Sequence, residues 1–423
     1  MTVMARVAGA LMVAILSLSV EAVAEPLAIV GARIYPAPDA ARINDGVVLI
    51  QDGKIVKVGT QSEIAVPRSA HVIDAHGAVV TAGFWNSHVH FMPTDLLNAN
   101  TADAAMLEDG LQAMLTRWGF TTVFDLGSST NNTLVLRQRI ASGEIAGPMI
   151  LTCGDPFFPE GGTPIYVRKY LEDHGWANEE VSTPEEAAAR AIHQLDRGTD
   201  AVKVFAGAIV GGDIGVLPMR LDIAKAVVAE AHKRGKPAFA HPSNYAGLNV
   251  AIDSGVDILS HTTATESGSH DPYGWTPALI ARMRARNMAL TPTMTLFEVE
   301  AKKSHLKPEI LAQTIKMITS ELKDFSAADG QILFGTDVGY TDAYDTTEEY
   351  RLMSAALDWR QILASLTVAP ASRFGYAAHK GRIAPGMDAD LVLIDGDPAE
   401  DPTAFARVRD TIRNGRVIWG RDR

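Results

Sequence analysis

The stretch TAGFWNSHVH, at residues 81–90, leads from an apolar run into two histidines that are separated by a single residue. In a β-strand, residues i and i+2 point to the same face, so His88 and His90 are expected to project together. From this stretch onward, across residues 83–375, short apolar runs alternate with segments of helical period. Such an alternation of β and α segments predicts a parallel sheet.

The strand that ends at His90 is the first of eight strand candidates in this region. Eight is the number that a (β/α)8 TIM barrel needs, so we expect an α/β barrel over residues 83–375. The other seven candidates are residues 121–124, 149–151, 201–205, 237–240, 257–260, 288–291 and 332–334. The clearest helical-period segments between them are residues 131–143, 220–234, 246–254 and 276–287.

The two flanking regions have a different texture, rich in Val and Ile and punctuated by turns. Short strand candidates stand on either side of Asp52-Gly53, which is a hairpin signal. The same pattern returns after residue 390, around Asn414-Gly415. We expect residues 25–82 and 376–423 to pair into one small composite β-sandwich beside the barrel.

Residues 1–24 read as a secretory signal peptide. Arg6 provides a positive start, residues 7–20 are almost wholly apolar, and Ala22-Val23-Ala24 fits a cleavage site. The alternative is a retained anchor, but the apolar run is shorter than the roughly 20 residues that span a bilayer. We therefore expect removal of this segment, a periplasmic location and no membrane attachment afterwards.

Composition narrows the function further. The formal net charge of the chain is −12, and no basic stripe is present, which excludes a nucleic-acid partner. Cys153 is the single cysteine, so an internal disulfide cannot form, and a buried structural thiol is favoured over a nucleophile. The sequence is compatible with a homo-oligomer and leaves the oligomeric state open.

In a (β/α)8 barrel, the chemistry lies where strands end and loops begin. A buried histidine alone is more often a core residue, and Asp337 alone could be a helix N-cap. Together, imidazole and carboxylate groups at the same end of a barrel suit zinc and similar divalent ions. The metal-ligand candidates at the predicted strand ends are His88, His90, Lys203, His241, His261 and Asp337.

Lys203 is the unusual member of this set, because it lies between Val202 and Val204 in a strongly apolar strand. It could simply reach solvent or pair with an acid. Burial would instead push it toward the neutral amine. A neutral amine can react with carbon dioxide to form a carbamate, whose two oxygens can bridge two cations.

Four segments resemble the amidohydrolase superfamily, over almost the whole chain after the leader. TAGFWNSHVH (81–90) resembles its strand-1 signature, and GTDAVKVF (198–205) resembles the strand-4 lysine segment of binuclear members. GTD (335–337) resembles the strand-8 aspartate, and KGRIAPGMDADL (380–391) the return into the composite sandwich. Within the superfamily, the sequence pattern is most similar to that of imidazolonepropionase-like and Xaa-dipeptidase-like members. Residues 85–87 depart from the usual pattern, but the histidines are intact.

The resemblance implies a binuclear centre that holds two divalent ions, for which we expect zinc, with a bridging hydroxide as the nucleophile. Asp337 would take the proton of the hydroxide and pass it to the leaving amine. The implied ligands are His88, His90 and Asp337 for the more buried metal, His241 and His261 for the second, and a carboxylated Lys203 bridging both.

The expected function is hydrolysis of a C–N bond in a small amide or peptide. Hydrolysis of a lactone, a carbamate or a phosphotriester on the same site is the main alternative. A mononuclear deaminase is disfavoured by Lys203 and by the lack of His-x-x-Glu near His241 or His261. A non-catalytic metal-binding protein is disfavoured because Asp337 is kept beside all the other ligands.

Candidate substrate contacts lie in the loops after the strands. The loop at residues 152–182 is long, and long loops at this face usually shape the pocket. It contains Tyr166 and Arg168, and the guanidinium could bind a substrate carboxylate. Tyr273 and Tyr340 follow the sixth and eighth predicted strands. The alternative is a solvated lid with a packed aromatic cluster.

Overall fold

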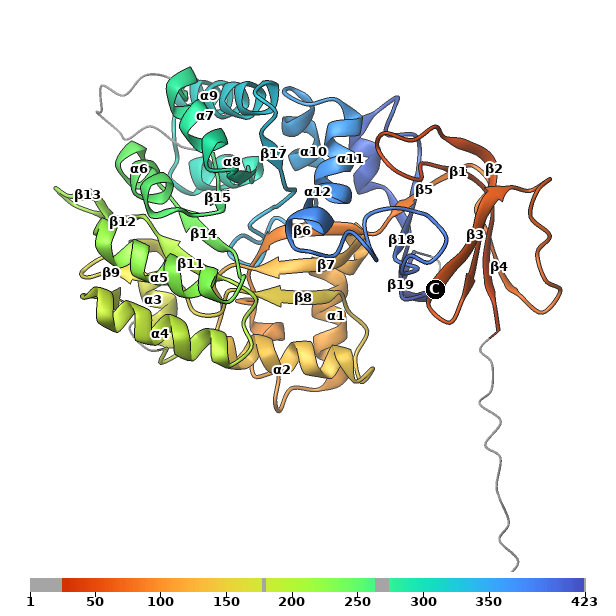
Figure 1. Ribbon diagram of the computed structural model, residues 1–423, viewed down its shortest axis with the longest axis horizontal. Helices are drawn as coiled ribbons and strands as arrows, with labels where there is room; N and C mark the ends of the chain where they lie inside the picture. Colours follow the sequence, from red (N-terminus) through yellow and green to blue (C-terminus); the bar gives the residue numbers. More distant parts are fainter. Residues whose placement is uncertain (1–24, 177–179, 263–273, 422–423) are drawn as a thin grey trace, which may run out of the picture.

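Strands from both ends of the chain share one mixed sheet, which lies to one side of the molecule (Figure 1). The computed structural model describes residues 25–176, 180–262 and 274–421, so the predicted leader at residues 1–24 lies outside it. The sheet order is β20-β19-β18-β5-β1-β2-β3, with β4 paired to β1. Its strands are β1 (Leu27–Ile34), β2 (Ile43–Gln51), β3 (Lys54–Thr60), β4 (His71–Asp74), β5 (Ala78–Ala82), β18 (Leu391–Asp395), β19 (Val408–Arg413) and β20 (Arg416–Gly420).

Two-residue turns set the register of this sheet. Asp52 and Gly53 both have positive φ, as the turn between β2 and β3 requires. Asn414 and Gly415 have the same conformation between β19 and β20. The apolar side chains of the sheet, including Ile29, form a buried cluster of their own, so it has a separate small core.

The middle of the chain forms two sheets of parallel strands. The order in the first is β6-β7-β8, and in the second β11-β14-β15-β16-β17. Backbone contacts join them at both flanks: Ser87 N donates to Phe334 O at 2.7 Å, and Phe157 N donates to Lys203 O at 2.9 Å. The strands are β6 (Phe84–Val89), β7 (Phe120–Asp125), β8 (Met149–Thr152), β11 (Val202–Phe205), β14 (Ala238–His241), β15 (Ile258–Ser260), β16 (Ala289–Thr291) and β17 (Gln331–Ile332).

Helices follow most of these strands and pack around them (Figure 1). Several begin at sequence signals, such as Thr183 and Thr276, each of which caps a helix with Pro at its start. The helices are α1 (Ala104–Met114), α2 (Thr130–Ala141), α3 (Ile165–Asp173), α4 (Pro184–Asp196), α5 (Leu221–Lys233), α6 (Tyr245–Ser254), α7 (Pro277–Ala285), α8 (Met294–Lys303), α9 (Pro308–Ala327), α10 (Thr347–Ser354), α11 (Trp359–Leu366) and α12 (Val368–Arg373).

The loops between these elements contain short strands and 3-10 helices. A hairpin of β12 (Gly207–Gly211) and β13 (Gly215–Pro218) follows β11, and β9 (Phe158–Pro159) pairs with β10 (Glu180–Val181). The short 3-10 helices are η1 (Thr94–Leu96), η2 (Thr116–Trp118) and η3 (Pro402–Ala406). Within the described residues, no helix combines the length and apolar character needed to cross a bilayer.

A buried ion pair lies where the mixed sheet meets the parallel strands. Lys380 and Asp390 are 7% and 6% exposed and are directly hydrogen-bonded. Asp390 Oδ1 also accepts from Asn414 N at 2.8 Å, and its carbonyl accepts from Gly83 N at 2.7 Å, just before β6 begins. The pair therefore anchors the point at which the chain passes from one sheet to the other.

Replacing Lys380 with Met should lower the free energy of unfolding by about 3–5 kcal/mol, because it leaves a buried carboxylate without its cation. Urea unfolding followed by circular dichroism measures the change. As a control, Lys169→Met removes an exposed ion pair with Asp173 and should leave the midpoint of urea unfolding unchanged. An unchanged midpoint in Lys380→Met would show that the pair does not hold this junction.

Candidate metal centre

The structure brings all six predicted ligands to one cavity of about 630 Å³. His88 belongs to β6, Lys203 to β11 and His241 to β14, while His261 directly follows β15. Asp337 follows β17 by a short loop. They meet because parallel strands direct their carboxyl ends to the same side, as the sequence suggested.

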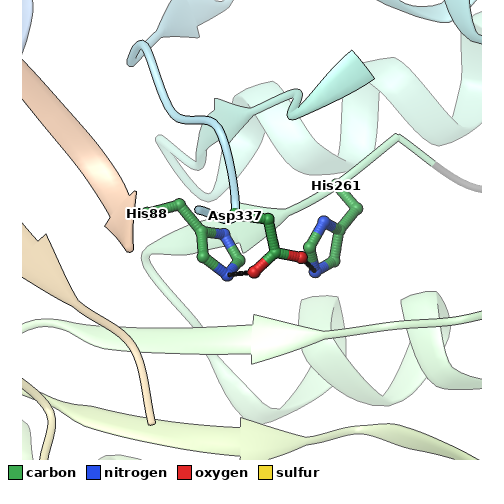
Figure 2. Close-up of side chains that lie close together, drawn as sticks. All are labelled: His88, His261 and Asp337. Carbon is green, nitrogen blue, oxygen red and sulfur yellow. Dashed lines mark ion pairs between the residues drawn. The ribbon is translucent and has the colours of Figure 1, made fainter. Parts of the chain in front are cut away.

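The carboxylate of Asp337 lies between the rings of His88 and His261 (Figure 2). Its Oδ1 is 3.2 Å from Nε2 of His88 and 2.9 Å from Nε2 of His90. Its Oδ2 is 4.0 Å from Nε2 of His261. The ligand atoms of His88, His261 and Asp337 all lie within 4.8 Å of one another, which fits a single metal ion.

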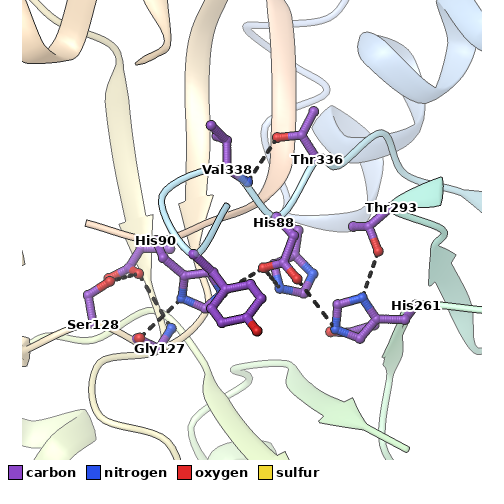
Figure 3. A network of polar contacts seen from close by, with 12 residues as sticks. His88, His90, Gly127, Ser128, His261, Thr293, Thr336 and Val338 are labelled. Atoms are coloured by element: carbon purple, nitrogen blue, oxygen red, sulfur yellow. Dashed lines mark hydrogen bonds and ion pairs between the residues drawn. The ribbon is translucent and has the colours of Figure 1, made fainter. Parts of the chain in front are cut away.

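Hydrogen bonds on the far side of the rings fix which nitrogen faces the carboxylate (Figure 3). Nδ1 of His90 lies 3.1 Å from Gly127 O, and a carbonyl only accepts, so this nitrogen carries the proton. Nδ1 of His261 lies 2.6 Å from Thr293 Oγ1, whose own proton goes to Pro292 O. In the neutral form of either ring, Nε2 therefore presents a lone pair to the centre.

The imidazole lone pairs and the carboxylate face one another in a buried space, which is unfavourable unless a metal ion or a proton lies between them. Burial lowers the pKa of His88 to about 4 and that of His241 to about 3, so these rings are neutral near pH 7. Burial tends to raise the pKa of Asp337, but His88 and His90 outweigh it and hold that pKa well below its usual value. Neutral imidazoles around an ionised carboxylate are the form that binds divalent metals.

Lys203 is fully enclosed beside this group. Its side chain is 1% exposed, and its Nζ donates to Ser260 Oγ at 2.7 Å. Burial lowers the pKa of Lys203 to about 8, so a substantial fraction of the amine is neutral at slightly alkaline pH. His241 lies on the neighbouring strand. The centroid of its ring is 4.7 Å from that of Phe205, on which it stacks, and 4.6 Å from that of His261.

Backbone strain gathers at this site. His261, Asp337, Thr293 and Ser243 all have φ between 47° and 69°, a region that residues other than Gly rarely adopt. Each stands at or just after the carboxyl end of a parallel strand. Such outliers persist where the surrounding structure holds them, and they cluster at functional sites.

Two glycines allow the Asp337 segment to press against β6. A Cβ on Gly339, which has a φ of 96°, would lie 1.7 Å from His90 O. A Cβ on Gly335 would lie 2.3 Å from Thr291 Cγ2 and 2.8 Å from His88 Cβ. The spacing Gly-Thr-Asp-Val-Gly is therefore a packing requirement that sets Asp337 beside the histidines.

Several supporting groups were not among the predicted site residues. Asp125 is buried and accepts from Ser128 Oγ at 2.5 Å, and Ser128 Oγ accepts from Phe91 N at 2.7 Å. These bonds fix the turn that aims the Gly127 carbonyl at His90. No sequence pattern identifies a carbonyl partner. Thr293 was recognisable only by its place just after the strand that pairs with β15.

The candidate substrate contacts differ in position. Tyr166 and Tyr340 line the cavity, with ring centroids 5.4 Å apart. Arg168 donates to Thr163 O at 3.2 Å and is not among the described residues that line the cavity. Tyr273 lies outside the described residues.

Comparison with known proteins agrees with this geometry. The profile of the amidohydrolase family matches residues 79–418. The chain belongs to the amidohydrolase family. It is 22% identical to the ochratoxinase of Aspergillus niger, over 91% of this chain and 86% of that protein.

Solved structures of similar fold include a candidate prolidase from Bifidobacterium longum, with a TM-score of 0.76 and 25% identity over 94% of this chain and 95% of that one. A Xaa-Pro dipeptidase with bound methionine has a TM-score of 0.77 and 22% identity, over 93% of this chain and 100% of that one. The chain is therefore an enzyme, a hydrolase of carbon–nitrogen bonds with the α/β fold of its family.

Thr293→Ala should weaken the affinity for a divalent metal by roughly 10- to 100-fold, because His261 loses the partner that fixes its tautomer and orientation. Competition with a metal chelator measures the affinity. Thr293→Ser keeps the hydroxyl and should retain most of it. Equal affinity in the Ala and Ser variants would contradict a role for the hydroxyl.

Proposed function

We propose that this amidohydrolase uses two divalent ions, with zinc as the expected metal, to hydrolyse the amide or peptide-type bond of a small molecule. The observation that carries the proposal is the convergence of three imidazoles, those of His88, His90 and His261, on the carboxylate of Asp337 at the base of a large cavity. The proposed ligands are His88, His90 and Asp337 for one ion, His241 and His261 for the other, and a carboxylated Lys203 between them.

The bridging role of Lys203 rests on its burial and its lowered pKa. The neutral amine would attack carbon dioxide, form an N–C bond and release one proton, which leaves an anionic carbamate. The remaining N–H could still donate to Ser260 Oγ, which now lies 2.7 Å from Nζ. The product has two oxygens and one negative charge, which suits two neighbouring cations.

Divalent ions at this site would lower the pKa of water and polarise the scissile carbonyl. Asp337 supplies the proton transfer, because its carboxylate is ionised and can accept a proton from the attacking water. The same oxygen can then deliver that proton to the departing amine nitrogen. Tyr166 and Tyr340 contact the substrate from the cavity wall, while contacts through Arg168 and Tyr273 stay predictions.

The finer architecture belongs to the same proposal. The backbone contacts at both flanks of the two parallel sheets support a closed (β/α)8 barrel over residues 83–375. The shared sheet supports a composite sandwich of residues 25–82 and 376–423. Removal of residues 1–24, export to the periplasm and a homo-oligomeric state stay predictions.

Asp337→Asn should remove most turnover of the metal-loaded enzyme, with a fall in kcat of at least about 100-fold, because the amide cannot accept the proton. The steady-state rate on a panel of dipeptides, N-acyl amino acids, simple amides and esters measures the effect. Asp342→Asn changes an exposed carboxylate in the following loop and should keep full activity. Full activity in Asp337→Asn would refute the proton-transfer role, and an ester-only enzyme would overturn the preference for amides.

Lys203→Ala should lower the metal content of the purified protein from about two ions toward one or none, because the bridging anion is lost. Elemental analysis measures the stoichiometry, and short carboxylic acids such as acetate should partly restore it. The matched control is Lys236→Ala, at a partly exposed lysine that pairs with Asp200 and does not line the cavity. Unchanged metal content in Lys203→Ala would contradict the bridge.

A further inference from the structure

The walls of the cavity above the metal centre are largely apolar. The side chains that form them come from the loop after β8, from α3, from the hairpin after β11 and from α8. Representative lining residues are Met92, Phe158, Ile165, Trp176, Phe205 and Phe297. A cavity of about 630 Å³ with such walls has room for a bulky apolar group on the substrate.

The charged groups in these walls are acidic. Among the described residues that line the cavity, Lys203 at its base is the sole Lys or Arg side chain, while Asp155 and Glu300 stand in the walls. Among the described lining residues, a substrate carboxylate in the upper cavity would therefore find no guanidinium or ammonium partner, since Arg168 donates to Thr163 O outside the lining.

Backbone N–H groups could also bind an anion, since several helices begin at the cavity. At α8, Glu349 already accepts from the N–H groups of Met294 and Thr295 at 2.8 and 2.7 Å. At α2, Asp155 accepts from Thr130 N at 3.3 Å. The chain's own carboxylates thus take the N-terminal donors of these two helices.

The α6 helix is capped in the same way, because Asn244 Oδ1 accepts from Gly247 N at 2.9 Å. Directly before α3, Glu180 accepts from Thr163 N at 3.1 Å and from its hydroxyl at 2.6 Å. Capping groups or acids therefore stand at the starts of the four helices that open onto the cavity. At α2 and α6 one backbone N–H, and at α8 two, already donate to a side chain of the protein, so fewer donors are left for a substrate carboxylate. At α3 the acid just before the helix would repel such a carboxylate.

Lys303, which lies beside the lining residue Ser304, is already paired. Lys303 Nζ lies 3.0 Å from Glu300 Oε1, which also accepts from the Tyr340 hydroxyl at 3.2 Å. The ammonium also lies 5.0 Å from the centre of the Tyr340 ring. Glu300 thus keeps Lys303 from presenting an unpaired positive charge to the substrate.

Given the proposed amide hydrolysis, we propose that the substrates are uncharged amides with a bulky apolar group, and that the cavity discriminates against a carboxylate beside the scissile bond. The scissile carbonyl would occupy the metal centre, so a neighbouring carboxylate must lie against the walls. Moving a carboxylate from water to apolar walls that offer no partner costs free energy, and the acids at the rim add electrostatic repulsion.

The test compares two amides that differ only by the carboxylate, N-benzoyl-phenylalanine and N-benzoyl-2-phenylethylamine, with the metal-loaded enzyme. We expect kcat/KM to be at least about tenfold higher for the neutral amide, because the other leaves a charge unpaired. Calorimetric titration of both compounds into the metal-free protein gives a readout that does not depend on turnover, with tighter binding expected for the neutral amide.

The outcomes separate the two proposals. Turnover that favours the carboxylate, or that is equal for both amides, overturns the substrate class and leaves amide hydrolysis standing. Turnover of neither amide, together with tighter binding of the neutral one, contradicts amide hydrolysis of such compounds and supports the selectivity of the cavity. Equal or reversed binding in the metal-free protein counts against the proposed class in every case.

Glu300→Gln tests the residue that sets the charge at the rim. It frees the Lys303 ammonium, so the preference for the neutral amide over the carboxylate should fall by several-fold. Glu298→Gln removes the same charge from the same helix, at a residue that pairs with Lys302 and Arg351 outside the cavity lining, and should keep the wild-type preference. An equal preference in both variants would show that Glu300 does not determine the selectivity.

Discussion

The site depends on one electrostatic constraint: imidazole lone pairs and an ionised carboxylate face each other in a space from which water is largely excluded. Oδ1 of Asp337 lies 2.9 Å from Nε2 of His90, and Nδ1 of the same ring donates to the Gly127 carbonyl, so the neutral ring has no proton left for Oδ1. Two acceptors at this distance repel unless a cation lies between them. The fold must therefore hold a locally unfavourable arrangement in place, and the surrounding packing does so.

That support comes from backbone geometry as much as from side chains. Asp337 and His261 stand in the left-handed region, which costs of the order of 1–3 kcal/mol at each position. Gly339 lets the Asp337 loop approach the carbonyl of His90, and Thr293 fixes the tautomer of His261. A strained backbone at strand ends is thus the means by which residues from separate strands reach a common point.

How much of this was predictable follows from the range of each interaction. The strand ends at His88, His241 and His261 were predictable, because an apolar run followed by a ligand-type residue is a local pattern. The turns at Asp52-Gly53 and Asn414-Gly415 were local in the same sense. The helices α8 and α9 were not identified, and neither was the hairpin after β11, since their place depends on packing against distant residues. Arg168 shows the same limit, because its bond to Thr163 O depends on how α3 begins.

The residues fall into two groups with different physical demands. The candidate metal ligands stand on parallel strands or in the short segments after them, where the strand ladders leave little freedom. The cavity walls come from α3, α8 and the hairpin after β11, which no strand register constrains. Glu349 links the two groups because it accepts from the first backbone N–H groups of α8. That helix carries Glu300 in the cavity wall, and it begins directly after Thr293, which is hydrogen-bonded to His261. One buried carboxylate from α10 therefore positions both the partner of a candidate metal ligand and an acid in the cavity wall. Under the proposed function, specificity and metal binding would be coupled through the beginning of this single helix.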